Sequence, residues 1–242
     1  MLEAALWGSA GGSALVVGAA IGLRFRFGAR TIGLVMGFGS GVLISALAFE
    51  LTEEAFAIGG TGPLVVGLLI GALSFFVADW YIDGRGGDHR KRSGGQQEAG
   101  SANAIVIGAL MDGIPESFVI GIVLLHHHDL PLAIVAAVFL SNVPESLSAA
   151  TGLRTAGHSP RYIISLWAGV MLVSALAAAA GYGFLGGASD ELIAGIEAFA
   201  AGAILTMLAD TMMPEAFEGG GNAVGLVTVA GFATAFLLTT VG

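Results

Sequence analysis

Apolar residues fill long stretches of this chain, and short polar breaks separate them. Eight stretches approach the roughly 20 residues that a helix needs to cross the hydrocarbon core of a bilayer. They cover about residues 3–24, 31–54, 62–83, 102–125, 130–153, 161–185, 191–213 and 223–241. In lipid, a segment of this length satisfies its own backbone polar groups only as a helix. The pattern predicts an all-α polytopic membrane protein, built as a bundle of eight transmembrane helices.

The composition agrees with a membrane protein. Hydrophobic residues make up 55% of the chain and charged residues only 11%, with a mean hydropathy of +0.86. A soluble domain would carry roughly 25% charged residues. The 39 glycines would let helices approach closely. We therefore expect a single transmembrane domain over residues 1–242, with the first span retained as a helix, the lipid bilayer as a partner and no nucleic acid.

The basic residues predict an orientation. They lie in the first, third and fifth connections, which share one side of the membrane: Arg24, Arg26 and Arg30; Arg85, Arg90, Lys91 and Arg92; Arg154 and Arg161. The positive-inside rule places that side in the cytoplasm. Both termini would then be extracytoplasmic in a plasma (inner) membrane. Residues 84–101 are expected to form a flexible cytoplasmic loop, and the seventh connection, near Glu215 and Glu218, should share its side.

Two of the predicted spans carry a proline followed by a glutamate near their middle. The motifs are Asp112-Gly113-Ile114-Pro115-Glu116-Ser117 and Ser141-Asn142-Val143-Pro144-Glu145-Ser146. A carboxylate at this depth is costly unless a cation or a polar partner offsets its charge. Each proline also frees one backbone carbonyl, and a short connection makes the two spans antiparallel neighbours. Oxygen ligands from both spans could therefore meet at one depth, as a metal-ion pathway requires.

Other polar residues leave alternatives open. Glu50 could join this layer or face a water-filled entrance, and Asp210 could mark an exit route or be an acid at a helix end. His126, His127 and His128 could be metal ligands at the entrance or a plain polar turn. Glu197 has no assigned role. A membrane metalloenzyme is disfavoured because no histidine lies inside a predicted span, so we expect no enzymatic activity and no prosthetic group.

With these features, the chain resembles the ZIP family of divalent-metal transporters over nearly its whole length. The fourth-span family pattern, His-Asn-x-Pro-Glu-Gly, corresponds to the segment from Asp112 to Ser117, and the fifth-span signature corresponds to Pro144-Glu145. The stretch ending in Ala48-Phe49-Glu50 is similar to the second-span pattern, with Glu50 at its histidine position. The segment from Asp210 to Glu215 is similar to the end of the seventh span.

The resemblance implies a metal site between the fourth and fifth spans, and commonly a homodimer. It gives ligand roles to Asp112, Glu116, Ser141, Asn142, Glu145 and Glu50. Asp112 and Gly113 stand where the family has histidine and asparagine, and the sixth span offers only small residues around Ser174. These departures favour one metal position over two, and oxygen ligands shift the preference from strict Zn²⁺ selectivity towards Mn²⁺, Fe²⁺ or a broad range.

The sequence thus predicts a transporter that moves a divalent metal ion, of the Zn²⁺, Mn²⁺ or Fe²⁺ type, into the cytoplasm. The ion would lose part of its water shell at Glu116, Glu145 and Asp112 and leave past Asp210. Two alternatives stay open. The chain could be a membrane receptor that binds metal without transporting it, or a proton-coupled carrier of a small organic solute that uses the same carboxylates.

Overall fold

The computed structural model describes residues 1–82, 102–126 and 132–241, and every regular element in these ranges is helical. The elements are α1 (Leu2–Arg24), α2 (Ala29–Ala46), η1 (Leu47–Thr52), α3 (Glu53–Gly59), α4 (Thr61–Ile82), α5 (Ala102–His126), α6 (Leu132–Thr155), α7 (Pro160–Phe184), α8 (Asp190–Met207), η4 (Leu208–Met212), α9 (Met213–Gly220) and α10 (Ala223–Val241). The expected loop over residues 84–101 lies outside the described residues.

The helices confirm the predicted fold class. Among the described residues, seven helices are long and apolar enough to cross a membrane, with mean hydropathies from 1.3 to 2.1. The eighth predicted span corresponds to α10, whose described apolar part is the shorter segment Ala223–Leu238. The chain is therefore a multi-pass helical membrane protein.

Two of the predicted spans are longer than the sequence indicated. The second was expected to end near residue 54, but α2, η1 and α3 continue as one helix over Ala29–Gly59. The seventh was expected to end near residue 213, but α8, η4 and α9 continue over Asp190–Gly220. Glu215 and Glu218 therefore lie in α9 rather than in a connection. Both expectations were wrong because the apolar pattern marks the part of a helix inside the hydrocarbon core, and a helix can continue beyond it with acidic residues.

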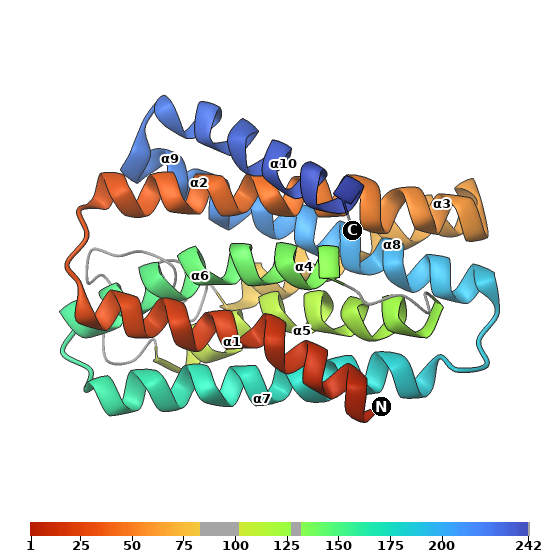
Figure 1. Cartoon of the computed structure of the whole chain (residues 1–242), viewed down its shortest axis with the longest axis horizontal. Coiled ribbons are helices and arrows are strands. Elements are labelled where there is room, and N and C mark those ends of the chain that lie inside the picture. The colour runs from red at the N-terminus through yellow and green to blue at the C-terminus, as the bar shows by residue number, and fades with distance from the viewer. Residues whose placement is uncertain (83–101, 127–131, 242) are drawn as a thin grey trace.

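The helices pack as two groups (Figure 1). In the first group, α1 packs against α6 and α7, and α5 packs mainly against α7. In the second group, α4 packs against α8, and α10 and α9 pack against α2. The groups meet where α2 lies along α6 and where α5 contacts α8. The two Pro-Glu motifs, on α5 and α6, therefore both belong to the first group.

The second group contains an internal repeat. Each of its two 31-residue helices is interrupted by a π-helical turn and ends with the same three residues near its last turn, Glu54-Ala55-Phe56 and Glu215-Ala216-Phe217. Each ends at a glycine in the left-handed region, Gly60 with φ 72° and Gly221 with φ 64°. The amide of each glycine donates to the phenylalanine carbonyl at 2.9 Å. The two halves therefore use the same helix-ending geometry.

Equivalent residues in the two halves also make equivalent contacts. A Cβ added at Gly71 of α4 would collide with the Phe199 carbonyl of α8, and one at Gly231 of α10 would collide with the Phe38 carbonyl of α2. Gly59 abuts Ala194 in the same way as Gly220 abuts Gly33. The α2–α3 helix and the α8–α9 helix are thus equivalent units, and each packs against the end of the other and against one shorter helix.

The first and fifth connections lie at one end of the bundle, as the span count requires. The guanidinium of Arg154, at the end of α6, donates a hydrogen bond to the carbonyl of Leu23 near the end of α1. In Figure 1, both chain termini lie away from the end that holds the α1–α2 and α6–α7 connections. This arrangement agrees with an even number of membrane crossings.

Candidate metal site

The two Pro-Glu motifs place a layer of polar side chains inside the protein. Both α5 and α6 continue through their prolines, so each motif stays on one helix. The predicted ligands on these helices are all buried, with exposed fractions of 2% for Asp112, 2% for Glu116, 1% for Ser141, 4% for Asn142 and 4% for Glu145. Since acids are rarely buried at membrane depth unless they serve a function, this layer is the candidate site.

Small residues let neighbouring helices close over the layer. A Cβ added at Gly113 of α5 would lie 3.5 Å from the hydroxyl oxygen of Ser174 on α7. A Cβ at Gly39 of α2 would lie 3.3 Å from the Cα of Ser141 and 2.8 Å from Cγ of Pro144, both on α6. The backbone of α2 therefore approaches the α6 motif closely, whereas α7 meets the α5 motif through the side chain of Ser174 at ordinary contact distance.

The hydroxyl groups of α6 are oriented by its own backbone. Ser141 donates to the carbonyl of Val138 at 2.9 Å, and Ser146 donates to the carbonyl of Asn142 at 2.8 Å. A hydroxyl group has one proton and two acceptor lone pairs. Because its proton is directed at Val138, Ser141 keeps its lone pairs for a donor or a cation.

The other two predicted ligands, Glu50 and Asp210, lie in the π-helical turns η1 and η4. The side chain of Glu50 is half-buried and that of Asp210 is exposed, so neither shares the full burial of the layer. The hydroxyl of Thr52 donates to the carbonyls of Leu47 and Ala48, both at 2.9 Å, across the widened turn. Sequence reasoning missed these turns, which are frequent at functional sites.

The acids of the site do not form a ready-made cluster. In the part of the chain that the structure describes, no three histidine, cysteine, aspartate or glutamate side chains come close enough to hold a metal ion together. A metal site built here would therefore need the hydroxyl of Ser141, the amide of Asn142 or water beside its acids. His126 ends α5, and His127 and His128 lie outside the described residues.

Glu197 on α8 is a buried acid to which the sequence assigned no role. Its exposed fraction is 0%, and neither of its carboxyl oxygens has a hydrogen-bond partner within the described residues. The signal available in the sequence was its position eight residues into an apolar helix that carries no basic residue. Nothing in the sequence showed which helix would pack against it.

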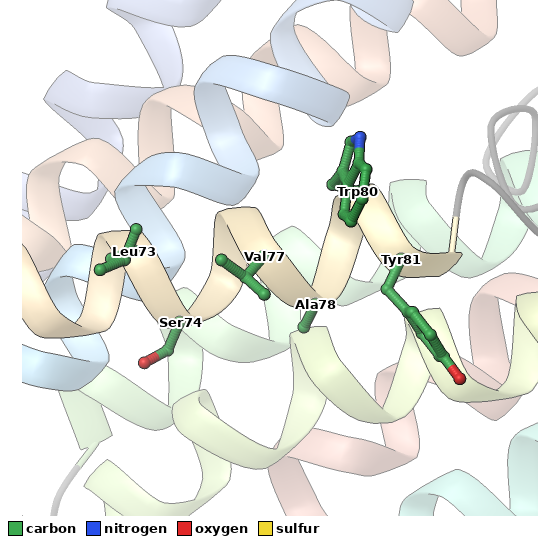
Figure 2. A pocket seen from close by; sticks show the side chains of 6 residues that line it. All are labelled: Leu73, Ser74, Val77, Ala78, Trp80 and Tyr81. Carbon is green, nitrogen blue, oxygen red and sulfur yellow. The ribbon is translucent and has the colours of Figure 1, made fainter.

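The hollow drawn in Figure 2 lies on α4 and is not part of the site. Its lining side chains include Leu73, Val77, Trp80 and Tyr81, which are 52–70% exposed. Trp80 and Tyr81 project from opposite sides of the end of α4 (Figure 2). Aromatic residues of this kind are enriched where a helix reaches the membrane–water interface. With no acid in its lining, this hollow is a lipid-facing surface and offers no ligand to a metal ion.

Comparison with known proteins adds nothing to this description, since no protein-family model matches the chain and a search of curated proteins finds no relative.

Proposed function

We propose that this protein is a transporter of divalent metal ions of the ZIP type, with its metal site formed by α5 and α6. One observation carries the proposal: acidic, amide and hydroxyl side chains on two proline-containing helices are buried near the middle of their spans. Glu116 and Glu145 are the principal ligands in this proposal, and Asp112, Ser141 and Asn142 assist them. These are oxygen ligands, so Mn²⁺ and Fe²⁺ are expected substrates beside Zn²⁺.

The two helix groups support alternating access. Transporters commonly move one helix group against another around a site near the membrane midplane. Here the α5–α6 layer would move with α1 and α7 relative to the repeat formed by α2–α3 and α8–α9. Glu50 would lie on the entry side and Asp210 on the exit side. Inward transport, extracytoplasmic termini, a plasma-membrane location and a homodimer belong to the same proposal, and the basic connections support the orientation.

Metal uptake into proteoliposomes tests the proposal. Zn²⁺, Mn²⁺, Fe²⁺, Co²⁺ and Cd²⁺ would be compared for the unmodified protein, Glu116→Gln and Glu145→Gln. Both variants should lose at least about tenfold in uptake, because each lacks a charged ligand worth more than 1.4 kcal/mol of metal binding. Uptake should also weaken as pH falls, since carboxylates bind metal only when deprotonated.

Glu191→Gln is the matched control, because Glu191 is an exposed acid in the first turn of α8. It should keep full uptake. Normal uptake by both site variants would refute the assignment of the ligands. Metal binding without flux would identify a receptor, and flux of an organic solute that resists a metal chelator would identify a proton-coupled carrier.

A further inference from the structure

Glu197 is buried in a part of the molecule that the proposed metal site does not use. It lies seven residues after the start of α8, about 10 Å along the helix axis. Its side chain is 0% exposed, and both carboxyl oxygens lack a hydrogen-bond partner among the described residues. An ionised carboxylate in this setting would be strongly unfavourable.

The surroundings of Glu197 supply no compensating group. Ala194 and Ala198, on either side of it along α8, pack against Ala55 of α3. This contact brings the neighbouring residue of α3, Glu54, close enough for its charge to repel a charge on Glu197. Glu54 is half-buried and lies six residues before Gly60, where α3 ends.

The helices that pack against α8 are α3, α4, α5, η1 and η4. Their described sequence contains no basic residue apart from His126 at the end of α5. The other titratable residues of these helices and of α8, besides Glu197, are Tyr81 and the acids Glu50, Glu53, Glu54, Asp79, Asp112, Glu116, Asp190, Glu191 and Asp210. Among them, Glu54 is the one that acts on Glu197. Within the described residues, these helices therefore supply Glu197 with no lysine or arginine to offset a negative charge.

The internal repeat shows that the fold does not need an acid at this position. Aligning Glu54-Ala55-Phe56 with Glu215-Ala216-Phe217 makes Met36 of α2 the equivalent of Glu197. Met36 is 1% exposed and is part of the apolar core. The same packing position is therefore filled by an apolar side chain in one half and by a carboxyl group in the other. The acid at position 197 is a specific feature of this half.

We propose that Glu197 and Glu54 form a proton-binding site, separate from the α5–α6 layer, in which the pair holds one proton. A divalent metal ion fits this place poorly because it needs about four or more ligands. The clusters formed by the residues beside Glu197 on α8 are apolar, and no group of three acids or histidines that could hold a metal ion is found among the described residues. A proton needs only one carboxyl oxygen, and it removes the repulsion between the two acids.

The proton transfer itself is simple. A hydronium ion gives its proton to the half-buried Glu54 and leaves as water, the proton passes to a carboxylate oxygen of Glu197, and Glu54 returns to its ionised form. Release follows the same route in reverse, with no change in oxidation state. Binding of the proton requires no assumption about what the protein transports. A role for this proton in driving metal transport would rest on the proposed function.

Infrared difference spectroscopy of the purified protein in lipid vesicles tests the proposal directly. At neutral pH, without added metal, the unmodified protein should show a protonated carboxyl band that Glu197→Gln removes. Glu197→Met introduces the methionine that the other half of the repeat has at the equivalent position, Met36. This variant should remove the same band while the protein stays folded. Glu191→Gln should retain it. Glu54→Gln should retain the band and shift it, because the neighbouring charge is lost.

Three results would overturn the proposal. The first is a spectrum in which neither Glu197 variant removes a protonated carboxyl band, since Glu197 would then be ionised. The second is loss of the band in the Glu191→Gln control. The third is loss of the band on adding Mn²⁺ or Zn²⁺ to Glu116→Gln protein at constant pH, which would make the pair a metal site. None of these readouts depends on transport, so the proposed function can fail without affecting this test.

Discussion

Burial divides the acidic residues of this protein into two kinds. Glu116 and Glu145 are buried, whereas Glu50 is half-buried and Asp210 is exposed. Burying a charge is expensive in a membrane, so the first kind is retained only where it binds something. The second kind can meet water or lipid headgroups without a ligand. The sequence placed all four at membrane depth but could not show this division, because burial depends on which helices pack together.

Asp112 provides a test of how ligand chemistry sets the choice of metal. It stands where the family pattern has histidine, and imidazole favours Zn²⁺ over Mn²⁺ more strongly than a carboxylate does. We expect Asp112→His to raise the ratio of Zn²⁺ to Mn²⁺ uptake by about tenfold, which corresponds to about 1.4 kcal/mol. Competition between the two metals in proteoliposomes measures this ratio.

Asp112→Asn is the control for that substitution, because it removes the charge without adding an imidazole. It should lower uptake of both metals and leave their ratio unchanged. If Asp112→His and Asp112→Asn give the same ratio, Asp112 does not contact the metal.

At the scale of the helices, each of the eight predicted apolar stretches corresponds to a helix, and errors occurred where a helix departs from regular geometry. The interruptions at η1 and η4 have no composition signal, because a π turn depends on how one added residue is accommodated by its neighbours. The repeat of Glu-Ala-Phe before Gly60 and Gly221 was readable in the sequence and could have predicted the two long helices. What it could not predict is that each helix packs against the end of the other.

Thr52 offers a test of the π turn η1. A π turn shifts backbone hydrogen bonds from the fourth to the fifth residue, which leaves one carbonyl without its regular partner. The hydroxyl of Thr52 reaches two carbonyls there, those of Leu47 and Ala48. Thr52→Val keeps the shape and removes these bonds, so we expect a loss of about 0.5–1.5 kcal/mol in stability. Thermal unfolding followed by size-exclusion chromatography measures the change.

Thr234→Val on α10 is the matched control for Thr52→Val. Its hydroxyl donates to the Ala230 carbonyl at 2.8 Å, on an exposed face of a regular helix. That carbonyl lies four residues before the amide of Thr234 and keeps its backbone bond, so the variant should be nearly as stable as the unmodified protein. Equal losses in the two variants would mean that η1 gains no particular support from Thr52.

At the scale of the whole molecule, the proposed mechanism requires the two helix groups to move against each other. The first group carries the α5–α6 layer, and the second group contains the repeat and the Glu54–Glu197 pair. The apolar contact between α5 and α8 crosses from one group to the other, where Ile122, 0% exposed, packs in one cluster with Ile193, 2% exposed. A covalent link at this contact should therefore stop transport if the groups move, and leave it intact if they do not.

The absence of cysteine from the chain makes that experiment direct. Ile122→Cys with Ile193→Cys, once oxidised, should lose nearly all metal uptake and regain it on reduction, because the disulfide ties α5 to α8. The control pair, Ala19→Cys with Ala150→Cys, lies within the first group, where α1 and α6 share an apolar cluster. Its oxidation should leave uptake unchanged, since these helices would move together. Uptake that survives the link between α5 and α8 would show that the ion crosses without relative movement at this contact.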